Sequence, residues 1–224
     1  ELRMFDEEPD PEREATDESL AASPGEWEER GYTAEERLKA PRGAIFETRL
    51  EAAEVLRLLG NGRYEGGDRE GALRAYRRAF WHVDFDLGYV QLEMTDFHQK
   101  QVFEAQAPCR LNVARCVLLE DSAEAKHQAE AVLEAAKICQ DFDTKWRVKA
   151  LYWRAKALVT AGRYDDAEAD LVQAAKLDPT DRLLRGALKD VKQQRHDLKK
   201  QQRHLYDGKL GPVAPPPERR CLIS

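Results

Sequence analysis

Small residues recur at the same spacing in two distant parts of the chain. In each set the second small residue follows the first by twelve positions and the third follows the second by seven: Gly60, Ala72 and Ala79, and Ala155, Ala167 and Ala174. Small side chains at fixed intervals allow two antiparallel helices to approach closely, and glycines lie between the helices of each set. Each set therefore predicts a helical hairpin. Because a single hairpin cannot bury its apolar face alone, the repetition predicts a stack of hairpins.

The stretch from Lys149 to Asp181 has the residue pattern of a tetratricopeptide repeat (TPR), whose period is about 34 residues. Larger side chains separate the alanines, and Pro179 ends the unit because proline lacks the N–H that continues a helix. We predict an all-α fold, a solenoid of three TPR repeats followed by a capping helix. The repeats are expected at about residues 45–83, 97–139 and 144–179, the middle one irregular. Residues 80–94 are interpreted as an extension of a helix followed by an irregular insertion.

The two ends of the chain carry opposite charge. Residues 1–40 contain fourteen acidic and five basic side chains, whereas residues 182–224 contain eleven basic and four acidic ones. Residues 1–40 are poor in apolar side chains, so we expect a disordered acidic leader. Near its end, Trp27 and Tyr32 are candidates to dock on the folded part, and Thr33 with Glu36 is a candidate helix cap. The chain starts at Glu1 rather than at methionine, which indicates processing or truncation of a longer product, and we expect truncation.

The C-terminal region contains a predicted helix and a short tail. Residues 180–210 are predicted to form the capping helix, with an apolar stripe at seven-residue spacing: Leu184, Val191, Leu198 and Leu205. The same spacing is typical of a coiled-coil dimer, which is the alternative, although a monomer is expected. Residues 211–224 are a proline-rich spacer followed by a CaaX box, Cys221-Leu222-Ile223-Ser224, whose terminal serine favours farnesyl. One prenyl chain gives weak membrane binding, so the basic C-terminal region is the expected second signal.

Residues 45–210 resemble the C-terminal TPR domain of the large immunophilins, the co-chaperones that follow an FK506-binding or cyclophilin domain. The stretches that carry the resemblance are RLLGNGRY at 57–64, RLNVARCVLL at 110–119, KALYWRAKAL at 149–158 and KKQQRHLYDGKLG at 199–211. The resemblance implies a groove that clamps two carboxylates at the acidic C-terminus of the seventy- and ninety-kilodalton heat-shock chaperones.

Residue by residue, the resemblance implies that the clamp contains Arg57, Asn61, Asn112 and Lys149. Trp153 stands where the family has a basic residue, and tryptophan offers only one N–H donor. Arg154 is the adjacent cation, but it lies about 100° round the helix and is expected to face elsewhere. Trp153 is therefore expected to weaken or alter the preference for the ligand, or to favour a more apolar peptide.

The sequence contains no convincing catalytic set, no ligand spacing for a metal and no signature of a bound cofactor. The glycines of residues 60–67 lack the lysine and Ser/Thr of a phosphate-binding loop, and no nucleic-acid motif accompanies the basic residues. We therefore predict a cytoplasmic, non-enzymatic adaptor that binds a heat-shock chaperone and is held at a membrane by a farnesyl group. The alternative is the C-terminal part of a peptidyl-prolyl isomerase whose catalytic domain lies upstream of Glu1.

Overall fold

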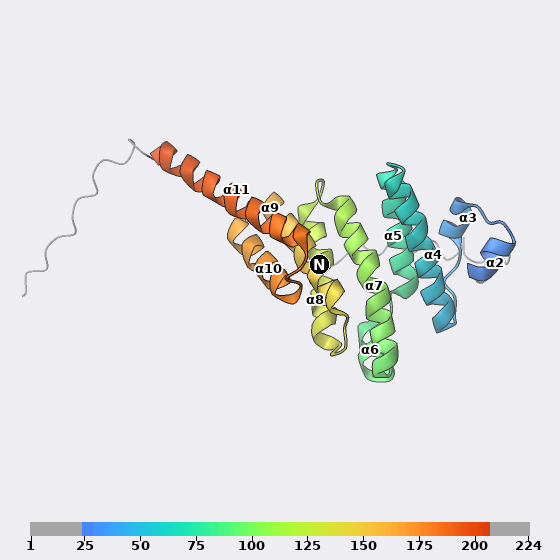
Figure 1. Cartoon of the computed structure of the whole chain (residues 1–224). Coiled ribbons are helices and arrows are strands. Elements are labelled where there is room, and N and C mark those ends of the chain that lie inside the picture. Colours follow the sequence, from blue (N-terminus) through green and yellow to red (C-terminus); the bar gives the residue numbers. More distant parts are fainter. Residues whose placement is uncertain (1–23, 207–224) are drawn as a thin grey trace, which may run out of the picture.

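The computed structural model describes residues 24–206, and over this range the chain forms helices and no strand (Figure 1). The helices are α2 (Pro24–Glu29), α3 (Ala34–Lys39), α4 (Phe46–Glu65), α5 (Arg69–Val83), α6 (Leu87–Glu93), α7 (Asp96–Val117), α8 (Ser122–Ile138), α9 (Thr144–Thr160), α10 (Tyr164–Leu177) and α11 (Arg182–Tyr206). The predicted all-α class is confirmed.

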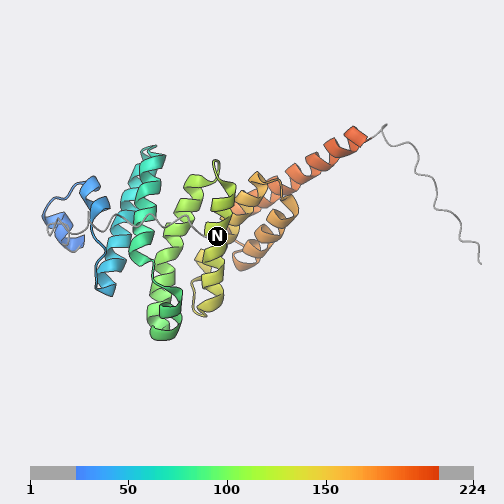
Figure 2. The same cartoon turned by 180° about the vertical axis from the view of Figure 1, so that it is seen from behind.

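Three antiparallel helix pairs, α4–α5, α7–α8 and α9–α10, lie in a row, and each pair packs on the next (Figures 1 and 2). The second helix of one pair contacts the first helix of the following pair, as in a solenoid whose repeats touch only their neighbours. The predicted three-repeat helical solenoid is confirmed. Its elongated form leaves one side of α4, α7 and α9 free of the partner helices, and this is where a groove forms.

Glycines make the tight turns within the first and third pairs. Gly67 between α4 and α5 has φ 84°, and Gly162 between α9 and α10 has φ 74°. Residues with a Cβ rarely adopt this left-handed conformation, so glycine is needed at both positions. Asp68 then begins α5 by accepting a hydrogen bond from the backbone N–H of Gly71 at 2.8 Å.

The small residues lie where the helices of a pair cross. A Cβ added to Gly60 would lie 2.5 Å from the Tyr76 ring, which is fully buried between α4 and α5. In the third pair, Ala155 and Leu171 occupy the equivalent positions and are both buried. The two pairs therefore fill the same contact with different combinations of a small and a large side chain.

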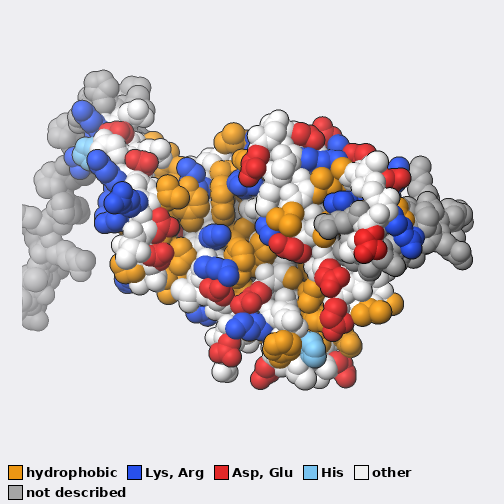
Figure 3. Space-filling model, turned by 45° about the vertical axis from the view of Figure 1, so that its right-hand side comes forward, with side chains coloured by type: hydrophobic (Ala, Val, Ile, Leu, Met, Phe, Trp, Pro, Cys, Tyr) orange, Lys and Arg blue, Asp and Glu red, His pale blue; other side chains and the backbone are white. Residues whose placement is uncertain are grey.

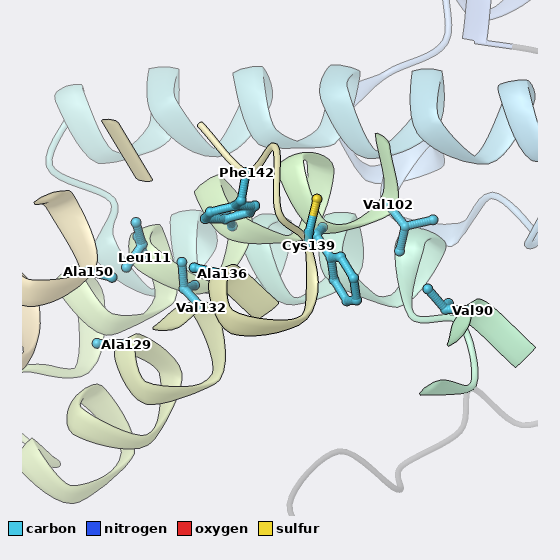
Figure 4. Packing of buried hydrophobic residues seen from close by; sticks show 11 residues of the cluster. Val90, Val102, Leu111, Ala129, Val132, Ala136, Cys139, Phe142 and Ala150 are labelled. Carbon is cyan, nitrogen blue, oxygen red and sulfur yellow. The ribbon is translucent and has the colours of Figure 1, made fainter. Parts of the chain in front are cut away.

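The hydrophobic core is a string of clusters along the row rather than one centre. The cluster in Figure 4 joins Val90 of α6, Val102 and Leu111 of α7, Val132 of α8 and Phe142 of the following turn. Because α6 contributes to it, the prediction of an irregular insertion after the helix extension is wrong for residues 87–93. Asp86 caps this short helix by accepting from the N–H of Tyr89 at 2.8 Å, which explains why the insertion becomes helical.

The prediction of a disordered acidic leader over residues 1–40 is wrong for residues 24–40, because these residues include α2 and α3. Trp27 is 2% exposed and packs with Ala40 and Ala52, while Tyr32 lies beside them. Burial of the large indole against α4 supplies the apolar contact that the charged composition obscured. The capping box of Thr33 and Glu36 is confirmed. Residues 1–23 lie outside the described residues.

The first half of α11 covers the end of the third pair, as the predicted capping helix requires. Leu184 and Val191 are 2% and 4% exposed and pack on the α9–α10 core, whereas Leu198 is 36% exposed. The apolar stripe is thus used within the chain at its start, and this observation does not support the coiled-coil alternative. The side chain of Leu205, the proline-rich spacer and Cys221 lie outside the described residues.

Candidate functional site

A groove of about 440 Å³ runs between α4, α7, α9 and the start of α11. It is lined by Arg57, Asn61, Glu65, Pro108, Leu111, Asn112, Arg115, Trp146, Val148, Lys149, Tyr152, Trp153, Asp181, Leu183 and Leu184. Five of the six residues that the sequence predicted for a peptide site therefore border one space, although they come from three helices. The sixth, Arg154, does not line it.

Two asparagines form a polar floor on the α4 and α7 side of the groove. The Oδ1 atom of Asn61 accepts hydrogen bonds from the Tyr76 hydroxyl at 2.9 Å and from Nδ2 of Asn112 at 3.3 Å. Both bonds use the carbonyl oxygen of Asn61, so its amide N–H groups remain the donors that a ligand can use. These hydrogen bonds tie side chains of α4, α5 and α7 together at the floor of the groove.

The predicted cations come from different helices of the groove, Arg57 from α4 and Lys149 from α9. Arg57 donates to both carboxylate oxygens of Glu54, at 2.8 and 2.5 Å, and this hydrogen bonding raises the pKa of Arg57. Lys149 is exposed, and its Nζ lies 4.9 Å from the centre of the Trp146 ring. A cation over an aromatic face is held without losing its charge, so Lys149 remains able to contact an anionic ligand.

Arg154 is the one predicted site residue that the structure removes from the groove. Its Nε and Nη2 atoms donate to the two oxygens of Asp170 on α10, at 2.7 and 2.6 Å. Asp170 is 6% exposed, and its hydrogen bond raises the pKa of Arg154. The inclusion of Arg154 among the site residues is wrong because a bidentate ion pair with a buried carboxylate already uses its donors.

Arg115 is a groove residue that sequence reasoning missed. Its Nη2 donates to the Tyr76 hydroxyl at 3.0 Å, and its guanidinium lies 3.8 Å from the centre of the Tyr64 ring. Its Nε is buried and has no hydrogen-bond partner among the described residues. The signal was present in the sequence, because Arg115 follows Asn112 by three positions and residues at this spacing share a helix face.

The α9 side of the groove is aromatic. Trp146, Tyr152 and Trp153 all line it, and the rings of Tyr152 and Trp153 meet edge to face with centroids 5.3 Å apart. Trp153 also packs against two core clusters, one shared with α8 and the other with α5. Hydrophobic side chains and Lys and Arg side chains lie next to one another on the face shown in Figure 3.

Three further features of residues 24–206 concern metal ligands, cysteines and helices that could span a membrane. No group of three or more His, Cys, Asp or Glu side chains within residues 24–206 is arranged to hold a metal ion. Cys109, Cys116 and Cys139 are buried, and burial raises the pKa of the Cys109 thiol to about 12, which keeps it protonated and unreactive. None of the helices in the described part of the chain is long and apolar enough to cross a membrane.

Comparison with known proteins supports the fold. Residues 148–181 match the family model described as tetratricopeptide repeat. The chain contains a TPR domain. It is similar to the C-terminal TPR-containing domain of a putative FK506-binding protein of Plasmodium falciparum, PFL2275c, with a TM-score of 0.55, 22% identity, and coverage of 70% of this chain and 96% of that one. At this identity the likeness establishes the TPR fold.

Two curated proteins of Arabidopsis thaliana are similar in sequence. Peptidyl-prolyl cis-trans isomerase FKBP42 is 26% identical over 178 residues, which are 80% of this chain and 46% of FKBP42. Outer envelope protein 61 is 26% identical over 156 residues, 70% of this chain and 25% of that protein. The chain thus spans about half the length of the first relative and a quarter of the second.

Proposed function

We propose that the TPR domain is the binding module of a co-chaperone-like adaptor, and that its groove holds the acidic C-terminal tail of a heat-shock chaperone. The observation that carries this proposal is the meeting of Asn61, Asn112, Arg57 and Lys149 around one groove. A C-terminal carboxylate needs convergent N–H donors and cations, and charge-assisted hydrogen bonds of this kind are strong. The similarity to immunophilin-type proteins supports the same assignment.

The decisive experiment is calorimetric titration of the full chain with an acetylated peptide ending Met-Glu-Glu-Val-Asp, beside the same peptide amidated at its C-terminus. We expect micromolar binding that amidation abolishes. Asn61→Ala should abolish it as well, because it removes donors at the floor of the groove. Lys156→Ala is the matched control, since Lys156 is exposed at the position of α9 equivalent to Asn61 but does not line the groove. Equal binding of both peptides would contradict the proposal.

Membrane attachment is the second part of the proposed function. Cys221 begins the CaaX box, and the far end of α11 carries exposed basic residues, Lys199, Lys200 and Arg203. A prenyl chain together with positive charge gives more stable binding to an anionic surface than either alone. Farnesyltransferase and farnesyl diphosphate should add one farnesyl group to the full chain but none to Cys221→Ser. Absence of this mass increase would remove the membrane proposal and leave the peptide site intact.

A second candidate function is the C-terminal part of a peptidyl-prolyl isomerase. It is favoured by the name of FKBP42 and by the fact that this chain aligns with less than half of it. A TPR domain is a binding fold rather than a catalytic one, so isomerase chemistry would have to come from residues outside this chain. A longer transcript that encodes an isomerase domain before Glu1, with isomerase activity of its product, would establish it.

A further inference from the structure

The groove is chemically divided: two amides and the arginines Arg57 and Arg115 lie on the α4 and α7 side, and the aromatic rings lie on the α9 side. Lys149 is the one cation of α9 that lines it. One turn further along, Trp153 borders the space, and the neighbouring Arg154 is occupied by Asp170. The α9 side therefore has little capacity to neutralise a second carboxylate.

Trp153 is fixed in place by its packing. It contacts the core cluster that contains Leu111 and the one that contains Ala114, so its indole fills the space between α9 and α7. Tyr152 holds it edge to face from the same helix. Leu183, which is 72% exposed, extends the apolar wall at the start of α11. A rigid aromatic wall with an exposed leucine at its end is a surface for an apolar side chain.

Arg115 supplies positive charge on the opposite side. The Tyr76 hydroxyl and the Tyr64 ring hold its guanidinium, and no carboxylate within residues 24–206 forms an ion pair with Arg115. It lines the same groove as Asn112, which precedes it by one turn of α7. A preorganised arginine beside two amide side chains matches the geometry of one carboxylate.

We propose that the groove selects peptides that end in a free carboxylate on a bulky apolar residue, such as leucine or phenylalanine, in preference to aspartate. Arg115 holds the carboxylate together with Asn61 and Asn112, and Trp153 contacts the terminal side chain. This inference rests on the proposed function, because it assumes that the groove binds C-terminal peptides, and it names the chemistry of the preferred partner.

The test measures binding of the full chain to four acetylated peptides, Met-Glu-Glu-Val-X, in which X is aspartate, asparagine, leucine or phenylalanine with a free carboxylate. The peptides that end in leucine or phenylalanine should bind roughly tenfold tighter than the one that ends in asparagine, since partial burial of one apolar side chain changes the dissociation constant by about tenfold. They should also bind tighter than aspartate. Trp153→Ala should abolish the preference, and Trp153→Arg should reverse it in favour of aspartate. Trp153→Phe keeps an aromatic ring in the core and should retain part of the preference if Trp153→Ala fails to fold.

Arg115→Gln should weaken the binding of all four peptides by roughly tenfold, because each peptide loses one charge-assisted contact. Arg74→Gln is the matched control, since Arg74 pairs with Glu70 on the surface of α5 outside the groove, and it should bind all four as the unchanged chain does. If no peptide with a free carboxylate binds, the proposed function fails and this inference fails with it. If the aspartate peptide binds tightest and Trp153→Arg leaves the order unchanged, the proposed function stands and the inference is overturned.

Discussion

The first and third helix pairs share a backbone plan but use different side chains where their helices meet. At equivalent positions the first pair has Gly60 against Tyr76, and the third has Ala155 and Leu171. At the positions one residue earlier on each helix, the polar side chains belong to the third pair instead of the first. Leu59 and Ala75 are apolar in the first pair, whereas in the third Arg154 and Asp170 form a bidentate ion pair.

This exchange explains which helix delivers polar groups to the groove. In the first pair the Tyr76 hydroxyl reaches Asn61 and Arg115, so a core residue orients the polar floor. In the third pair Arg154 pairs with Asp170 outside the groove, whereas Lys149 and Trp153 of the same helix line it. One repeat plan can therefore line the two sides of a groove with different chemistry without any change of fold.

The largest expected effect comes from breaking the ion pair of the third helix pair. Asp170→Ala leaves the Arg154 guanidinium without its carboxylate in a largely buried place. We expect the free energy of unfolding to fall by about 2 to 3 kcal/mol, somewhat less than for a fully buried pair because Arg154 remains partly exposed. Urea denaturation monitored by circular dichroism measures this change.

The double variant Arg154→Leu with Asp170→Ala gives the third pair the residues of the first and serves as its control. Replacement of a buried ion pair by apolar side chains is often neutral or stabilising, so most of the lost stability should return. If the double variant is no more stable than Asp170→Ala, the two side chains do not act as a pair and the comparison between the repeats is wrong at this contact.

The second expected effect concerns His82, whose equivalent in the third pair is Leu177. His82 is 1% exposed, and neither ring nitrogen has a hydrogen-bond partner among the described residues. Burial, together with the positive charges of Arg78, Arg42 and Arg49, lowers the pKa of His82 to about 3. An unfolded histidine has a pKa of about 6.5, so the unfolded state binds the proton first.

Acid therefore lowers the free energy of unfolding through His82. Stability from the neutral His82 is fully present above pH 6.5 and is lost as the pH falls from there toward 3, and at pH 5 the loss is about 2 kcal/mol. His82→Leu and His82→Asn should both flatten the decline between pH 7 and pH 5, measured by urea denaturation at each pH. If both variants lose as much stability between pH 7 and pH 5 as the unchanged chain does, other groups cause the acid sensitivity.

The repeats were predictable because their signals are local, whereas the state of each polar side chain depends on partners far along the chain. The spacing of Gly60 and Ala155 with their partners was enough for the fold. Asn61 and Asn112 were suggested instead by the resemblance to the immunophilin TPR domain, and both line the same groove. The partnership of Arg154 with Asp170 depends on how α10 is rotated against α9, and no local pattern encodes it. The docking of Trp27 was only a possibility in the sequence for the same reason, because its receptor is formed by α4 after folding.

The smallest expected effect tests the contact between Gly60 and Tyr76. A Cβ at residue 60 would lie 2.5 Å from the Tyr76 ring, and the ring is held by its hydroxyl, so Gly60→Ala forces a shift that costs about 1 to 3 kcal/mol. Alanine regains about 1 kcal/mol of helix propensity, which leaves a net loss of about 1 kcal/mol in unfolding free energy.

Gly62→Ala on the same helix is the matched control, because nothing lies within 4 Å of its added Cβ and it should stabilise the chain by up to about 1 kcal/mol. The double variant Gly60→Ala with Tyr76→Leu reproduces the third pair. It should recover stability but weaken peptide binding, since Asn61 and Arg115 lose the hydroxyl that orients them. Equal stabilisation by Gly60→Ala and Gly62→Ala would mean that the crossing of α4 and α5 has room for a methyl group, and the choice of glycine in the first pair and alanine in the third would then have no steric cause.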